Sequence, residues 1–268
     1  VFLLITALFG QAAMTDWAWR IPFLSSFVLV AIGLYVRLKL TEAPIFLADL
    51  NKPKPKALPM MEVIVTHFKP FFLGMLICIA GYVLFYIMIA FSQIYAKSTP
   101  TVSEAGYTMG LGFSPQIFTA LLMCSAISLA ITIAISGKYI DIVGRRIWLI
   151  WTTFGVAIFG LALPYFLDNG TTTSLFWFLM IGMGLIGMGY GPLASLLPEL
   201  FPTHARYSGA SLTYNISGLF GASVAAIITL PLNANYGLKG VGIYLTLNAV
   251  LSLIGLWFIT ETKDKHLA

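Results

Sequence analysis

The densest group of chemically active residues lies at positions 137–146, where four charged residues stand between two long apolar runs. Asp141 can accept a hydrogen bond from a basic side chain or cap a helix N-terminus, and Arg145 and Arg146 can pair with acidic groups. Gly137 would let a neighbouring helix approach closely, and Gly144 would permit a tight turn. This combination predicts a conformational latch. Simple anchoring at a membrane surface is the alternative, but it explains only the two arginines.

A second group of charged residues follows a later apolar run. Glu199 and Arg206 enclose His204, and Pro198 and Pro202 bracket Glu199 and end the helix there. We predict that Glu199 and Arg206 are partners in the same latch. A solvated loop is the alternative.

The candidate substrate-binding residues are polar and uncharged. Tyr82, Tyr86 and Gln93 follow an i, i+4, i+11 spacing, which would place them on one helix face. Asn215 lies in a later run, and Tyr190 lies near the middle of a glycine-rich one. Such groups could hydrogen-bond a small polar solute within the membrane. Hydrogen bonds between helices, or an interfacial tyrosine belt, are the alternative.

Patterns for catalysis, metal binding or nucleotide binding are missing from the sequence. Three scattered histidines and the cysteines Cys78 and Cys124 show no metal-ligand spacing. Residues 182–187 match G-x-G-x-x-G, but no strand precedes them, so they indicate a close-packing helix face. We therefore predict no enzyme, no catalytic residue, no metal and no cofactor.

Membrane-spanning helices must position these residues. Of the 268 residues 59% are hydrophobic and only 9% charged, whereas a soluble domain carries about 25% charged residues. Lipid cannot satisfy backbone polar groups, and the runs are too long for barrel strands, so we predict an all-α polytopic membrane protein. Seven complete spans are expected, at residues 20–38, 70–96, 113–137, 147–167, 174–198, 208–232 and 240–261.

The chain ends and the charge distribution predict its organisation. Residues 1–13 are apolar but too short to span, so we expect the chain to begin inside a helix, with an N-terminal portion missing. Residues 39–69 hold alternating lysines and prolines and are expected to form an extended linker. Most of the 15 lysines and arginines fall on one side of the membrane, which the positive-inside rule makes cytoplasmic. This bias indicates topology and not nucleic-acid binding.

Several segments together resemble a known family. Residues 137–146 resemble the loop motif between the second and third helices of each half of major facilitator superfamily transporters. Residues 198–202, with the Arg-Tyr-Ser-Gly-Ala-Ser run that follows, resemble the link between the tenth and eleventh helices. Residues 19–23 and 42–46 resemble the sixth helix and its exit. The whole is similar to the metabolite:proton symporter branch, which includes shikimate, 2-oxoglutarate, citrate and proline or betaine transporters.

The resemblance implies a domain order. Residues 1–38 would end the N-terminal bundle, 39–69 would be the cytoplasmic central linker, and 70–268 would form the C-terminal six-helix bundle. The protein would be a monomer of the cell inner membrane with a cytoplasmic C-terminus.

The resemblance also implies an activity. The protein would carry a small polar metabolite, an organic acid or zwitterion, with a proton as coupling ion, by alternating access. From residue 70 onward no span has an ionisable residue in its interior, so we expect the proton carrier in the N-terminal half. A uniporter, an efflux antiporter and a non-transporting receptor remain alternatives.

Overall fold

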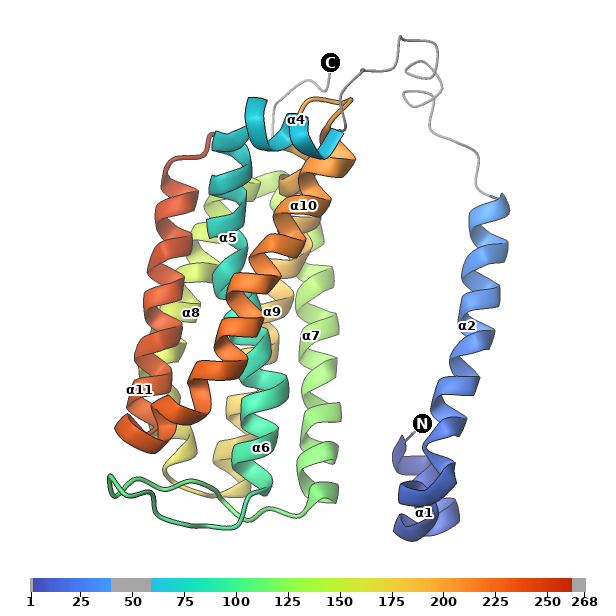
Figure 1. Ribbon diagram of the computed structural model, residues 1–268, viewed down its shortest axis with the longest axis vertical. Coiled ribbons are helices and arrows are strands. Elements are labelled where there is room, and N and C mark those ends of the chain that lie inside the picture. The colour runs from blue at the N-terminus through green and yellow to red at the C-terminus, as the bar shows by residue number, and fades with distance from the viewer. Residues whose placement is uncertain (1, 40–58, 262–268) are drawn as a thin grey trace. The chain divides into compact units, whose positions relative to one another are not determined.

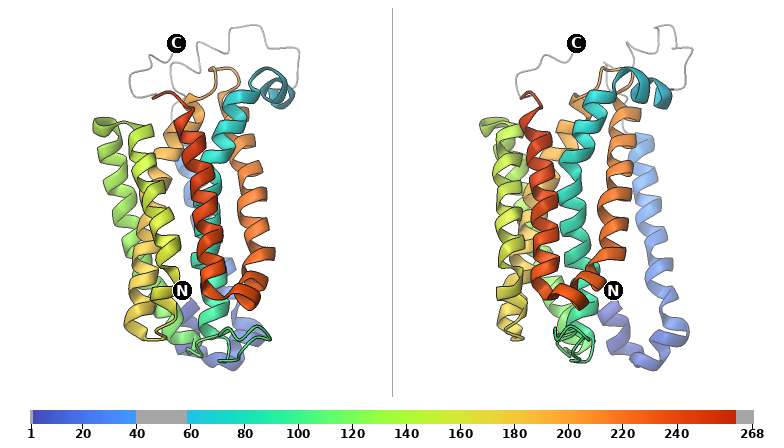
Figure 2. Two further views of the ribbon diagram at one scale, coloured as in Figure 1. Left: turned by 90° about the vertical axis from the view of Figure 1, so that its left-hand side faces the viewer. Right: turned by 60° about the vertical axis from the view of Figure 1, so that its left-hand side comes forward.

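The computed structural model describes residues 2–39 and 59–261, which are helical apart from the connection at 98–114 and shorter ones. The connection at 98–114 contains one isolated bridge, between Val102 and Thr108. The chain divides into two compact units, Val1–Lys54 and Pro55–Ala268. Each unit is described by itself (Figures 1 and 2).

The first unit contains α1 (Phe2–Ala13), the π-helix η1 (Met14–Ala18) and α2 (Arg20–Lys39). The stretch Met14–Lys39 is long and apolar enough to cross a membrane, in agreement with the span expected at 20–38. Almost all of its large apolar side chains are exposed within the described chain. Such a surface suits contact with lipid or with other helices.

The second unit is a helix bundle. Its elements are α4 (Pro59–Thr66), α5 (Phe68–Tyr86), η2 (Ile87–Phe91), α6 (Ser92–Lys97), α7 (Pro115–Val143), α8 (Arg145–Leu167), α9 (Thr172–Glu199), α10 (Arg206–Gly218), η3 (Leu219–Ser223) and α11 (Val224–Trp257). The long helices stand side by side, and α4 lies across one end of them (Figures 1 and 2). The core fills the space among α5, α8, α9 and α11 with large apolar side chains, including Leu84, Phe159, Phe178 and Val241.

The spans expected at 208–232 and 240–261 belong to one continuous 52-residue stretch, Arg206–Trp257. Gly237 interrupts it with φ 66° and ψ −169°, a conformation that glycine adopts without strain. Figure 1 shows the chain descending through α10 and returning in the opposite direction along the last part of α11. Six membrane-length stretches in the described residues therefore agree with seven expected spans.

The segment expected to be a turn, residues 137–146, is mostly helix. α7 continues to Val143, because no helix breaker precedes Gly144, and α8 begins at Arg145. The connection between the two helices is therefore Gly144 alone, with φ 103°.

The glycine-rich face of α9 packs against α7, as the sequence predicted. A Cβ atom on Gly187 would collide with Thr132, and one on Gly191 would collide with the hydroxyl of Ser136. At Gly137, by contrast, a Cβ would meet no described atom within 4 Å. At Gly137, α9 therefore lies against the backbone, where a Cβ on Gly191 would be 3.5 Å from Gly137 N, and the side that a Cβ of Gly137 would occupy is open.

Two local features of the second unit differ from expectation. The π-helix η2 holds more residues per turn than an α-helix, so it rotates Gln93 off the face that carries Tyr82. The other feature is α4, which occupies part of the expected linker at 39–69 because Val63 buries itself against Phe201 and Ala205. The lysine–proline run of that linker lies outside the described residues.

Candidate functional site

An ion pair joins two helices at the end of the bundle where α7 meets α8. The guanidinium of Arg145, on the first residue of α8, lies 3.1 Å from the carboxylate of Glu199, on the last residue of α9. Only 15% and 12% of these side chains is exposed. Arg145 Nε also donates to Ser195 Oγ at 3.2 Å. Asp141 is more peripheral, at 3.6 Å from Arg145 and with 73% of its side chain exposed.

Arg146 and Glu261 connect α8 and α11 reciprocally. The side chain of Arg146 donates to the backbone carbonyls of Leu256 at 2.8 Å and Trp257 at 3.1 Å, at the C-terminal end of α11. In return, the Glu261 carboxylate accepts from the backbone N–H groups of Arg145 at 3.0 Å and Arg146 at 3.1 Å. Each helix end thus receives the charge that its dipole favours.

Glu261 also explains why residue 144 is glycine. A Cβ atom there would lie 2.7 Å from a carboxylate oxygen of Glu261, and the φ of 103° is one that L-residues rarely adopt. Sequence reasoning missed Glu261, because only the fold brings this residue next to a helix that begins more than a hundred positions earlier. The sequence had suggested that Asp141 could cap a helix N-terminus, but at the start of α8 this role belongs to Glu261.

The expected partnership of Glu199 with Arg206 is not present among the described residues. Glu199 pairs with Arg145, and Arg206 Nε is buried without a hydrogen-bond partner in that part of the chain. His204, which stands between them in the sequence, pairs instead with Glu62 of α4 at 2.8 Å. The short loop after α9 turns His204 toward α4.

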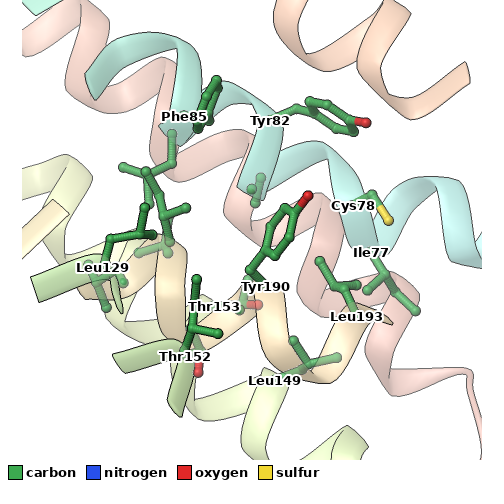
Figure 3. A pocket seen from close by; sticks show the side chains of 18 of the residues that line it. Ile77, Cys78, Tyr82, Phe85, Leu129, Leu149, Thr152, Thr153, Tyr190 and Leu193 are labelled. Carbon is green, nitrogen blue, oxygen red and sulfur yellow. The ribbon is translucent and has the colours of Figure 1, made fainter. Parts of the chain in front are cut away.

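A cavity of about 270 Å³ lies inside the second unit, among α5, α7, α8, α9 and α10. Its wall is largely aliphatic, and its polar groups are those of the side chains Cys78, Tyr82, Thr152, Thr153, Tyr190 and Tyr214. In Figure 3, Tyr190 extends from α9 toward the helix that carries Tyr82 and Cys78. Charged side chains do not occur among the described residues of the wall, so the cavity suits a solute without net charge.

Only two of the five predicted binding residues are among the described residues that line the cavity. Tyr82 and Tyr190 line the cavity, whereas Tyr86, Gln93 and Asn215 are not among its described lining residues. Tyr86 donates from its hydroxyl to the carbonyl of Ala226 at 3.4 Å, and Asn215 Nδ2 donates to Ser211 O at 2.8 Å within its own helix. Gln93 lies beyond the π-helix in α6 and is displaced by it.

Tyr214 is a cavity residue that sequence reasoning missed. Its ring lies 5.0 Å from that of Tyr82, centroid to centroid. The sequence prediction named its neighbour Asn215 instead, and one position in a helix turns a side chain by about 100°. The cavity thus offers three phenol groups, from Tyr82, Tyr190 and Tyr214, whose hydroxyls can hydrogen-bond and whose ring faces attract cations.

Comparison with known proteins gives a consistent picture. Residues 107–268 match the family described as "Sugar (and other) transporter". A Haemophilus influenzae protein named for metabolite transport is 88% identical over 100% of this chain, which covers 60% of that protein. The Escherichia coli inner membrane metabolite transport protein YhjE is 39% identical over 99% of the chain, which covers 59% of YhjE.

A more distant relative has a named set of substrates. The glycine betaine/proline/ectoine/pipecolic acid transporter OusA of Dickeya dadantii is 28% identical over 100% of the chain, which covers 53% of OusA. The chain therefore spans between half and two thirds of the length of these relatives. No solved structure matches the chain significantly.

Proposed function

The chain belongs to the sugar (and other) transporter family of the major facilitator superfamily, and on that premise we propose that it forms part of a secondary active transporter for a small polar solute. This is a family of transporters rather than of enzymes. Alternating access requires a central site and contacts that hold one state closed. The second unit offers a candidate for each.

The observation that carries the proposal is the Arg145–Glu199 pair. It joins the start of α8 to the end of α9 with little of either side chain exposed. In a low-dielectric environment an ion pair is strong while both partners are in contact. Separating them while one charge stays buried is energetically costly, so the pair favours either the formed or the fully separated conformation. We place Gly137, Asp141, Gly144, Arg145, Arg146 and Glu199 in this latch and add Glu261; Arg206 borders it without pairing to Glu199.

The substrate class follows from the cavity lined by Tyr82, Tyr190 and Tyr214. A zwitterion carries no net charge, and a quaternary or secondary ammonium group binds favourably against aromatic faces. OusA is named for such solutes, glycine betaine and proline among them. The second unit would supply one wall of the binding site.

The proposal also covers the coupling ion and the orientation of the chain in the membrane. Proton symport rests on the resemblance to the metabolite:proton symporters. In the described spans from residue 68 onward, the charged residues stand toward helix ends or, like Lys239, next to the turn at Gly237. The proton carrier would therefore lie outside the second unit. We place the chain in the inner membrane, with residues 1–38 and 70–268 in separate bundles and the end of α8 that carries Arg145 on the cytoplasmic side.

The test uses a chimera in which the 268 residues replace the matching part of the 88% identical Haemophilus influenzae protein. Cells that express the chimera are given radiolabelled glycine betaine, proline and 2-oxoglutarate, with and without an uncoupler. The expected result is saturable uptake of a zwitterion that the uncoupler abolishes. Uptake that the uncoupler leaves unchanged would indicate a uniporter. Accumulation of 2-oxoglutarate alone, or of none of the three solutes, would contradict the proposed substrate class.

A further inference from the structure

Three metal-ligating side chains from separate parts of the sequence meet at the end of the bundle where α4 lies. Glu62 belongs to α4, His67 stands between α4 and α5, and His204 lies in the loop between α9 and α10. Their carboxylate oxygen and imidazole nitrogens all lie within 4.8 Å of one another. Figure 1 shows α4 crossing this end of the bundle beside the start of α10.

The backbone around these side chains is held by a small apolar core. Val63, next to Glu62, is fully buried against Phe201 and Ala205, and Ala205 directly follows His204. The carbonyl of Val63 also accepts a hydrogen bond from the backbone N–H of His67 at 3.1 Å. The three side chains are therefore brought together by buried packing and not by chance contact of mobile loops.

The donor set matches a known kind of metal site. Two imidazoles and one carboxylate are the three protein ligands of several zinc sites, with water in the fourth position. His67 precedes α5 but makes no side-chain capping bond to the described helix, so its imidazole is not used there. The close pair in the cluster joins His204 Nε2 and Glu62 Oε1 at 2.8 Å.

The distances are compatible with binding after a small adjustment. Ligand atoms at about 2.0–2.2 Å from a tetrahedral zinc ion lie about 3.3–3.6 Å apart. Separations of up to 4.8 Å in the cluster must therefore shorten by up to about 1.5 Å, while the 2.8 Å pair of His204 and Glu62 must open slightly. His204 can supply that movement, because 46% of its side chain is exposed. Buried Ala205 keeps the backbone in place while the His204 side chain rotates.

We propose that Glu62, His67 and His204 bind one divalent transition-metal ion of the zinc type. The ion would connect α4 to the loop between α9 and α10, next to the helix that ends at Glu199 of the latch. The sequence gave no spacing signal for this site, because Glu62 and His204 are 142 positions apart. It departs from the prediction, made from sequence spacing, that the chain binds no metal.

The test is calorimetric titration of the full 268-residue chain, purified in detergent, with Zn²⁺ alone. One Zn²⁺ per chain is expected. His67→Gln and His204→Gln should each weaken binding by about 100-fold, since even the loss of an outer partner of a metal ligand costs 10–100-fold. His266→Gln is the matched control, because it changes the third histidine of the chain and should leave the affinity unchanged.

Thermal unfolding gives a second readout. Zn²⁺ should raise the unfolding temperature of the unmodified chain and of His266→Gln, but not of His67→Gln or His204→Gln, because only a chain that binds the ion is stabilised by it. Circular dichroism shows whether each variant is folded. If a histidine variant is unfolded, Glu62→Gln replaces it and should show the same loss. Absence of saturable binding, or equal affinity in all folded variants, would overturn the proposal.

Discussion

The guanidinium of Arg145 lies 3.1 Å from the carboxylate of Glu199, and this contact fixes the start of α8 against the end of α9. An arginine at a helix N-terminus faces the positive end of the helix dipole, which is unfavourable by itself. The carboxylates of Glu199 and Glu261 offset that repulsion from two directions. The latch is therefore an arrangement in which Glu199 faces the guanidinium of Arg145 and Glu261 faces the backbone N–H groups at the start of α8.

Replacing the buried acid should cost more than replacing the exposed one. Glu199→Gln leaves Arg145 largely buried with a weaker partner, and we expect the free energy of unfolding to fall by about 1 to 2 kcal/mol. Asp141→Asn makes the same chemical change at a side chain that is 73% exposed, and we expect less than about 0.5 kcal/mol. Denaturant unfolding in detergent measures both. Equal losses would show that Arg145 does not depend on Glu199.

Two glycines in the same motif should respond to alanine with opposite signs. Gly144→Ala places a Cβ against Glu261 at a φ of 103°, so we expect a loss of about 1 to 3 kcal/mol. Gly137→Ala adds a Cβ that meets no described atom within 4 Å, inside α7, so we expect a gain of about 0.5 to 1 kcal/mol. The same unfolding measurement compares them, and a loss at Gly137 would show that the position of its added methyl group is not open.

Asp168 should make stability depend on pH. Partial burial raises its pKa, and the positive charge of Lys239 only partly opposes this. The folded state then holds the proton more tightly than the unfolded state, so stability is lost as pH rises through the raised pKa. Asp168→Asn should remove that loss and stabilise the protein by about 0.3 kcal/mol at pH 7, an amount limited by solvent screening. The difference should vanish below the ordinary aspartate pKa; a gain that persisted there would contradict this origin.

Tyrosines in the cavity wall should contribute to substrate binding, whereas Tyr86, a predicted binding residue that is not among the described residues of the wall, should not. Tyr190→Phe removes a hydroxyl from the cavity wall, and we expect the affinity of the chimera for its zwitterion to fall about tenfold, the equivalent of one hydrogen bond. Tyr86→Phe removes a hydroxyl that faces Ala226 O, so we expect less than a twofold change. Competition with unlabelled solute measures both affinities. An equal loss in the two variants would move the site away from the cavity.

Hydropathy was sufficient to predict the spans, because a helix must be apolar along its length to cross lipid. The end of α7 was misplaced, since Lys138 and Asp141 interrupt the apolar run there and the helix nevertheless continues until Gly144. The prediction that Gln93 shares a helix face with Tyr82 was also wrong, because no residue pattern marked the π-helix at Ile87–Phe91.

Partner choice was the least predictable part of the site. Glu261 and Glu62 reach their partners across more than a hundred positions, and these contacts depend on the helix order around the bundle. Sequence spacing reports which residues share one helix face, but not which faces meet. Tyr190 was predicted to bind substrate because it stands near the middle of its own span, whereas Tyr214 required the packing of α10 against α5.

The latch itself is tested most directly by the rate of solute uptake in the chimera with Arg145→Gln, Glu199→Gln and both changes together. If the pair acts as one unit, each single change should lower the uptake rate by about tenfold, and the double change should be no worse than either single one. Uptake at the unmodified rate in all three variants, with equal amounts of protein in the membrane, would contradict a latch formed by Arg145 and Glu199.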